Sequence, residues 1–182
     1  MDALGEARGL HEPASPSHQR RLIDLQGVYD RLPRLEESPH VVTSAPDDTY
    51  NCVGWVFREL DAYYAPDLKW PADVPPPDDP DQDLDAYVAL FASRGYSVCG
   101  TPDVEYGFLK IALYAKDHAF HHVAKQLPNG EWSSKLGEAH DLRHEHLEAL
   151  EGDTVYFKGA VASVFMKRPY DPNDPNEWFN LE

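Results

Sequence analysis

In the first half of the chain, apolar residues recur at the spacing of amphipathic helices. Three segments show this pattern: 22–32, which ends before Pro33; 52–64; and 84–91, between a capping Asp83 and a terminating Gly95. Positions three and four apart lie on the same face of a helix, so each segment presents one apolar stripe to a core. The sequence therefore predicts three short helices before residue 96.

After Tyr96 the apolar period falls from about 3.6 residues to about two, which is typical of β-strands. Pro128-Asn129-Gly130 separates two such runs and indicates a hairpin, because these residues favour a tight turn. Helices followed by antiparallel strands predict an α+β fold. The expected strands are 96–99, 108–113, 119–127, 131–136, 153–156 and 160–166.

The chain of 182 residues suits one main domain. We expect an N-terminal tail and docking helix at 1–40, a single α+β domain at 41–168 and an acidic C-terminal tail at 169–182. Residues 65–81 are rich in proline and aspartate and are expected to form an irregular loop, because proline removes backbone donors.

The negative net charge limits the kinds of molecule that the protein is expected to bind. Lys plus Arg number 16 and Asp plus Glu number 32, giving a formal net charge of −16. Such a chain repels phosphate backbones and anionic headgroups, so we expect neither nucleic-acid nor membrane binding. No signal peptide or apolar span is visible, which favours a cytoplasmic protein, and two cysteines are too few for a disulfide framework.

Cys52 follows Asn51, a good N-cap residue, and should lie in the first turn of its helix. Unpaired amides and the helix dipole favour a thiolate there, which predicts a pKa below that of a free thiol. The structural alternative is a small buried apolar side chain, and this is the interpretation adopted for Cys99.

A reactive thiolate needs a histidine that the fold places near it. His121 and His122 are the histidines that fall within a strand pattern. A two-residue hairpin loop would put His122 on the face of Ser133 and Lys135. A three-residue loop, favoured by the turn residues, puts it on the face of Ser134 instead.

These motifs resemble two groups of proteins. Cys52 at a helix start, followed later by His122-Val123 and Asn129-Gly130, is similar to the NlpC/P60 branch of the papain-like cysteine hydrolases. A closer resemblance, over about residues 48–168, is to an uncharacterised bacterial family with Asn-Cys-x-x-Trp and a hairpin of the form His-x-Ala-x-Gln-Leu-Pro-x-Gly-x-Trp-x-Ser-Lys-Leu-Gly.

The papain-like resemblance implies a papain-like α+β fold, with N-terminal helices packed on an antiparallel sheet. It also implies a cysteine hydrolase that acts on an amide, peptide or isopeptide bond without a cofactor. Cys52 would be the nucleophile, His122 the base and Ser134 the orienting residue, where such hydrolases usually have His, Asn or Asp. Asn51, Trp55 and Gln126 are the candidate substrate-binding residues, and the expected partner is a peptide or protein.

Two other functions remain open. An acidic interaction domain of the immunity or inhibitor kind fits the charge of −16. A metal-binding module would draw on the histidines, with His140 and His144 at the i, i+4 spacing of a helical site. Its possible ligands are Cys52, His118, His121, His122, His140, His144 and His146.

Overall fold

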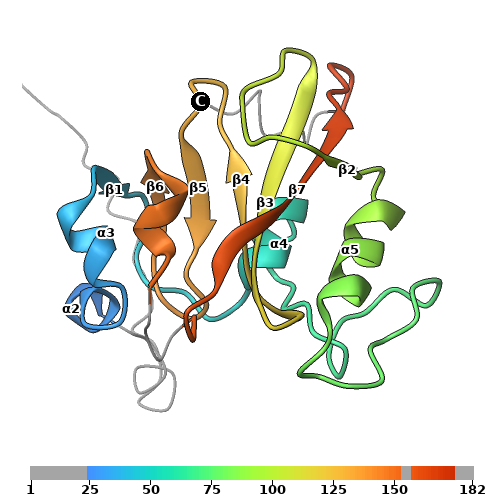
Figure 1. The fold of residues 1–182 in the computed structure, drawn as a ribbon, viewed down its shortest axis with the longest axis horizontal. Coiled ribbons are helices and arrows are strands. Elements are labelled where there is room, and N and C mark those ends of the chain that lie inside the picture. Colours follow the sequence, from blue (N-terminus) through green and yellow to red (C-terminus); the bar gives the residue numbers. More distant parts are fainter. Residues whose placement is uncertain (1–23, 153–156, 175–182) are drawn as a thin grey trace, which may run out of the picture.

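The fold is a mixed α+β arrangement built on one antiparallel seven-stranded sheet (Figure 1). The computed structural model describes residues 24–152 and 157–174. The strand order is β1-β6-β5-β4-β3-β7-β2, so the two short strands β1 and β2 form the edges. The strands are β1 (His40–Val42), β2 (Ser97–Cys99), β3 (Phe108–Lys116), β4 (Ala119–Gln126), β5 (Trp132–Lys135), β6 (Asp141–His144) and β7 (Val161–Pro169).

The predicted helices are present, but two differ in extent. Within the described part of the first, α2 spans Leu25–Tyr29, and Pro33 begins a separate helix, α3 (Pro33–Glu37). Proline suits the first turn of a helix because its missing N–H would have no partner there. The third predicted helix is α5 (Leu84–Ser93). Asp83 precedes it, but its carboxylate accepts a hydrogen bond from the amide of Phe120 instead of capping the helix.

The helix that begins at Cys52 is shorter than predicted. α4 (Cys52–Phe57) ends at Arg58, which adopts a left-handed conformation with φ of 60°. The chain then folds back across Gly54, and the carbonyl oxygen of Ala62 lies 2.3 Å from the position of a Cβ at that glycine. Leu60 and Tyr64, predicted to extend the apolar face of the helix, therefore belong to the returning segment.

The β4–β5 hairpin has the favoured three-residue loop. Gln126 pairs with Trp132 and Lys125 with Ser133, and Leu127 donates its amide to the carbonyl of Glu131. Gly130 has φ of +90°, the left-handed conformation that glycine adopts without strain. This register places His122 and Ser134 on the same face of the sheet, as the turn residues predicted.

Four described elements were not predicted: helix α3, strands β1 and β6, and a 3-10 helix, η1 (Leu147–Leu150). The strand expected at 153–156 lies outside the described residues. In residues 65–81 the described chain forms no helix or strand, apart from an isolated bridge between Tyr64 and Lys69. Trp70 anchors this loop by its bond to the carbonyl of Val74 and by its contact with Tyr87.

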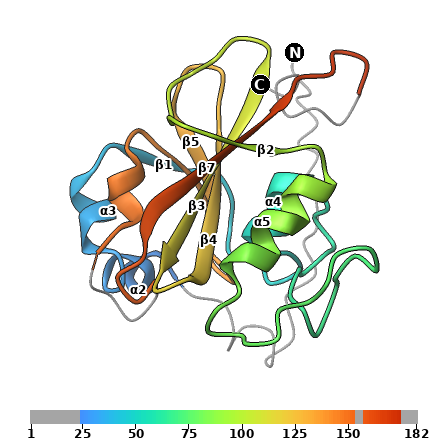
Figure 2. The same ribbon diagram turned by 45° about the vertical axis from the view of Figure 1, so that its right-hand side comes forward.

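The sheet separates two apolar cores (Figure 2). We call the core against α4 and α5 the helical-face core; it contains Cys52, Val123, Leu113 and Phe91. The core against α2, α3 and η1 is the opposite-face core, which contains Tyr114, Trp132, Leu142 and Phe157. None of the described helices is long and apolar enough to cross a membrane.

Candidate functional site

Asn51 fixes the start of α4, as predicted. Its side-chain oxygen accepts hydrogen bonds from the amides of Gly54 (3.1 Å) and Tyr64 (3.2 Å), and its side-chain nitrogen donates to the carbonyl of Tyr64 (2.7 Å). One side chain thus caps the helix and ties the returning segment to it. Cys52 therefore lies in the first turn of α4, directly after the residue that caps the helix and binds the returning segment.

The thiol of Cys52 is buried in the helical-face core, with 8% of the residue exposed. Burial raises the pKa of Cys52 to about 11, although the amides of Val123, Val53 and Cys52 face the sulfur and lower it. The predicted direction was wrong, because loss of solvent outweighs the helix dipole for a side chain this deep. At neutral pH the resting side chain is a thiol.

His122 begins a chain of hydrogen bonds within the opposite-face core. Its Nε2 lies 3.0 Å from Ser134 Oγ, and Ser134 Oγ lies 2.9 Å from Nε2 of His144. The chain ends where Nδ1 of His144 lies 2.9 Å from the carbonyl oxygen of His146. Each of the three side chains belongs to a residue that is at most 1% exposed. The predicted contact between His122 and Ser134 is therefore present.

The carbonyl at the end of this chain fixes the direction of every bond in it. A carbonyl only accepts, so His144 carries its proton on Nδ1 and its Nε2 is the acceptor for the Ser134 hydroxyl. Ser134 then accepts from Nε2–H of His122. It follows that the neutral His122 ring keeps Nδ1 unprotonated.

Both imidazoles are neutral in their surroundings. Burial, and then the charge of His144, lower the pKa of His122 to about 3. Burial likewise lowers the pKa of His144 to about 4. The ring of His122 stacks on Phe157, with centroids 4.9 Å apart, and contacts Tyr114. Aromatic rings replace water around the imidazole and disfavour its charged form.

Cys52 and His122 both line one cavity of about 450 Å³. The two side chains come from different cores, and no hydrogen bond links them among the described residues. α4 therefore packs on the face of the sheet opposite to the one that carries the His122 ring. The remaining lining residues are Asn51, Tyr63, Tyr64, Ala65, Tyr87, Phe120, His121, Gly137, Glu138 and Phe157.

A β-bulge brings His121 to the same cavity. Tyr114 pairs with His122, whereas Ala115 pairs with Phe120, so His121 is the extra residue of β4. Strict strand alternation would place His121 on the opposite side from His122, and the bulge breaks that alternation. His121 makes no side-chain hydrogen bond within the described residues, and burial lowers its pKa. It is thus a second imidazole in the cavity without the partners of His122.

Trp55 and Gln126, proposed for substrate binding, lie elsewhere. Trp55 donates from Nε1 to Ser133 Oγ and stacks on Tyr50. Gln126 donates to the carbonyl of Pro102 and lines a different cavity with Gly130. Neither side chain lines the cavity that holds Cys52, so only Asn51 of the three predicted residues does so.

His144 is the residue of this site that sequence reasoning assigned to another role. It lies on strand β6 and not on a helix, so His140 and His144 do not form the i, i+4 helical metal site considered as an alternative. Within residues 24–152 and 157–174, no group of three His, Cys, Asp or Glu side chains is arranged to hold a metal ion. In the sequence, the only indication of this role was that His144 lies in a short polar segment after the hairpin, with which it could pair.

Comparison with known proteins identifies a family and no activity. A family model described as a domain of unknown function (DUF7689) matches residues 41–166. Searches of curated proteins and of solved structures found no match to the chain. The family match covers more than half of the sequence, including Cys52, His122, Ser134 and His144. The chain therefore belongs to the DUF7689 family.

Proposed function

We propose that this protein is a papain-like cysteine hydrolase that cleaves an amide or isopeptide bond with Cys52 and His122. The observation that carries the proposal is the fixed tautomer of His122. Its Nε2–H is committed to Ser134, which leaves Nδ1 as the ring's acceptor, and His122 lines the same cavity as Cys52. A base must present an unprotonated nitrogen to the proton that it removes.

In this mechanism, Nδ1 of His122 takes the thiol proton while Cys52 Sγ forms a bond to the substrate carbonyl carbon. The carbonyl electron pair moves to oxygen, and the amide of Cys52 at the start of α4 serves as one oxyanion donor. Collapse of this intermediate expels the amine, which takes the proton from Nδ1. Water then gives a proton to Nδ1 and attacks the thioester, and Cys52 regains its proton when the acid leaves.

The hydrogen-bond chain supports the charged form of His122 during these steps. When Nδ1 gains a proton, Nε2–H becomes a stronger donor to Ser134, whose own hydroxyl donates to His144. Ser134 carries no charge, so it positions the imidazole without raising its pKa strongly. The resting pair is therefore neutral, and charge develops only as the substrate carbonyl is attacked.

A reactive ester tests the proposal without knowledge of the natural substrate. The protein is treated with p-nitrophenyl acetate, and acetylation of Cys52 is followed by peptide mass spectrometry. We expect acetylation of Cys52 in the parent and a rate about 100-fold lower in His122→Ala, because general-base catalysis contributes about 10²–10⁴-fold. His121→Ala is the matched control, since His121 lines the same cavity, and it should react like the parent.

A binding domain without catalysis is the second candidate, favoured by the net charge of −16 and by the raised pKa of the buried Cys52 thiol. Such a domain would use its acidic surface to contact a basic partner. It predicts that Cys52 is not acetylated faster than Cys99, and that His122→Ala and His121→Ala react at the same rate. Either result would reject the hydrolase.

A further inference from the structure

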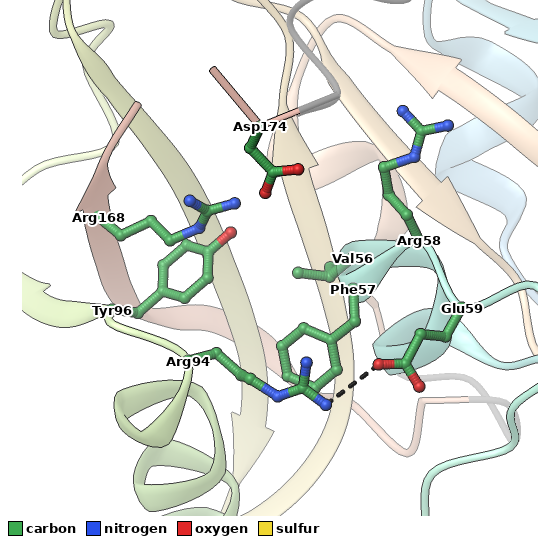
Figure 3. A pocket seen from close by; sticks show the side chains of 8 residues that line it. All are labelled: Val56, Phe57, Arg58, Glu59, Arg94, Tyr96, Arg168 and Asp174. Atoms are coloured by element: carbon green, nitrogen blue, oxygen red, sulfur yellow. Dashed lines mark hydrogen bonds and ion pairs between the residues drawn. The ribbon is translucent and has the colours of Figure 1, made fainter. Parts of the chain in front are cut away.

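A second cavity lies at the C-terminal end of α4, away from Cys52, and three arginines line it. Its volume is about 430 Å³, and Arg58, Arg94 and Arg168 all contribute to its lining (Figure 3). They come from the end of α4, the end of α5 and strand β7. Three of the chain's nine arginines thus share one cavity in a protein whose net charge is −16.

Two of these arginines are held on aromatic rings. The guanidinium carbon of Arg94 lies 4.6 Å from the centre of the Phe57 ring, and that of Arg168 lies 5.5 Å from the Tyr96 ring. Arg94 Nη2 also donates to Glu59 (3.1 Å) and to the Tyr64 hydroxyl (2.9 Å). Stacking and tethering reduce the conformational freedom that these side chains would lose on binding a ligand.

Hydrogen-bond donors remain unused at this cavity. The side-chain bonds of Arg94 involve Nη2 alone, so Nε and Nη1 have no acceptor in the part of the chain that the structure describes. The guanidinium of half-buried Arg58 forms no hydrogen bond or ion pair with any described residue. An arginine has five N–H donors in a fork that matches carboxylate and phosphate oxygens.

The acidic side chains of the lining do not cancel this charge. Glu59 and Asp174 face three arginines, and Glu59 is also bound by Lys69 and by the Tyr64 hydroxyl. Asp174 points into the cavity near Arg168 in Figure 3. Burial, and then the charge of Arg58, lower the pKa of Lys125 to about 7, so the positive field of Arg58 extends to a neighbouring strand.

We propose that this cavity binds the carboxylate or phosphate group of a small anionic ligand between Arg58, Arg94 and Arg168. The guanidinium groups supply the hydrogen bonds, and the Phe57 and Tyr96 rings hold two of them in place. The Asp174 carboxylate occupies part of the same space and competes with the ligand. This proposal does not depend on the reaction proposed for Cys52.

Calorimetric titration with inorganic phosphate and with malonate, at matched ionic strength, tests the site. We expect saturable binding of at least one anion, and the tighter one identifies the group that the site accepts. Arg58→Gln should weaken binding about tenfold or more, since it removes charge-assisted hydrogen bonds. Arg34→Gln should bind like the parent, because Arg34 is exposed and pairs with Glu151 outside this cavity.

Asp174→Asn should change the anion affinity in the opposite direction to Arg58→Gln. Removing the competing carboxylate should tighten anion binding, and partial unfolding could not produce that change. Absence of saturable binding by both anions would overturn the proposal. Equal affinities for Arg58→Gln and Arg34→Gln would also overturn it.

Discussion

The cores on the two faces of the sheet differ in the polar side chains that they bury. The helical-face core is almost entirely apolar, and its one nucleophile, Cys52, is packed among Val53, Val123 and aromatic rings. The opposite-face core surrounds a polar chain of His122, Ser134 and His144 in which each hydrogen bond has a defined direction. The thiol thus comes from a core that disfavours charge, and the base comes from a buried network that can share a proton.

The helical face depends on the close return of the chain over Gly54. Gly54→Ala places a methyl group 2.3 Å from the carbonyl oxygen of Ala62 and 2.9 Å from that of Glu59. Backbone atoms cannot move aside cheaply, so we expect a loss of about 4 kcal/mol or more in the free energy of unfolding. Helix propensity alone predicts the opposite sign, a gain of about 0.5–1 kcal/mol.

Chemical denaturation measures this difference. Gly100→Ala is the matched control, because a Cβ there meets nothing within 4 Å and its φ is not positive. It should change the free energy of unfolding by less than about 0.5 kcal/mol. A Gly54→Ala variant as stable as Gly100→Ala would show that the segment after α4 does not pack as described.

The opposite face depends on Ser134. Ser134→Ala leaves two buried groups without partners, Nε2–H of His122 and Nε2 of His144. Each unsatisfied group costs about 1–3 kcal/mol, so we expect a loss of about 3 kcal/mol. Ser133→Ala removes only the acceptor of the half-buried Trp55 N–H and should cost about 1 kcal/mol, as measured by urea denaturation. Equal losses in the two variants would contradict the directed chain.

Lowering the pH should destabilise the folded protein through the same opposite-face core. The pKa values of His122 and His144 are lowered to about 3 and about 4 in the folded state, below the ordinary value of 6.5. The unfolded chain therefore binds more protons below pH 6.5, and stability falls as the pH drops from 6.5 towards 4. Between pH 6.5 and 5.5 the two histidines together should cost about 2 kcal/mol.

Denaturation at a series of pH values measures how much of this loss in unfolding free energy comes from His122 and His144. His122→Gln should remove about half of the loss that this pair contributes, since of the two residues only His144 would still take up a proton on unfolding. The exposed His118→Gln should show the pH dependence of the parent. If His122→Gln and His118→Gln lose stability equally, His122 is not a buried neutral imidazole.

The hairpin was predictable from local sequence because its turn residues define its register. Pro128-Asn129-Gly130 selects the three-residue loop, and this alone puts His122 on the face of Ser134. The cap at Asn51 was also local, since its side chain bonds an amide three residues away. In both cases the interacting groups lie close together in the sequence.

The features that the sequence did not predict depend on distant partners. α4 stops early because residues 59–64 pack over Gly54, which helical spacing cannot reveal. Strand β6 escaped prediction because its buried polar residues, Asp141 and His144, form hydrogen bonds with Tyr50 and Ser134 from other segments. The raised pKa of Cys52 likewise follows from burial in a core assembled from several elements.

The proposed mechanism requires that His122 presents an unprotonated Nδ1 at neutral pH, and ring nitrogen chemical shifts measure this directly. In a protein with ¹⁵N-labelled histidine, we expect opposite neutral tautomers for two residues between pH 5 and 8. His122 should carry its proton on Nε2, and His144 should carry its proton on Nδ1. A proton on Nδ1 of His122, in either a neutral or a charged ring, would contradict the account because that nitrogen could not accept the thiol proton.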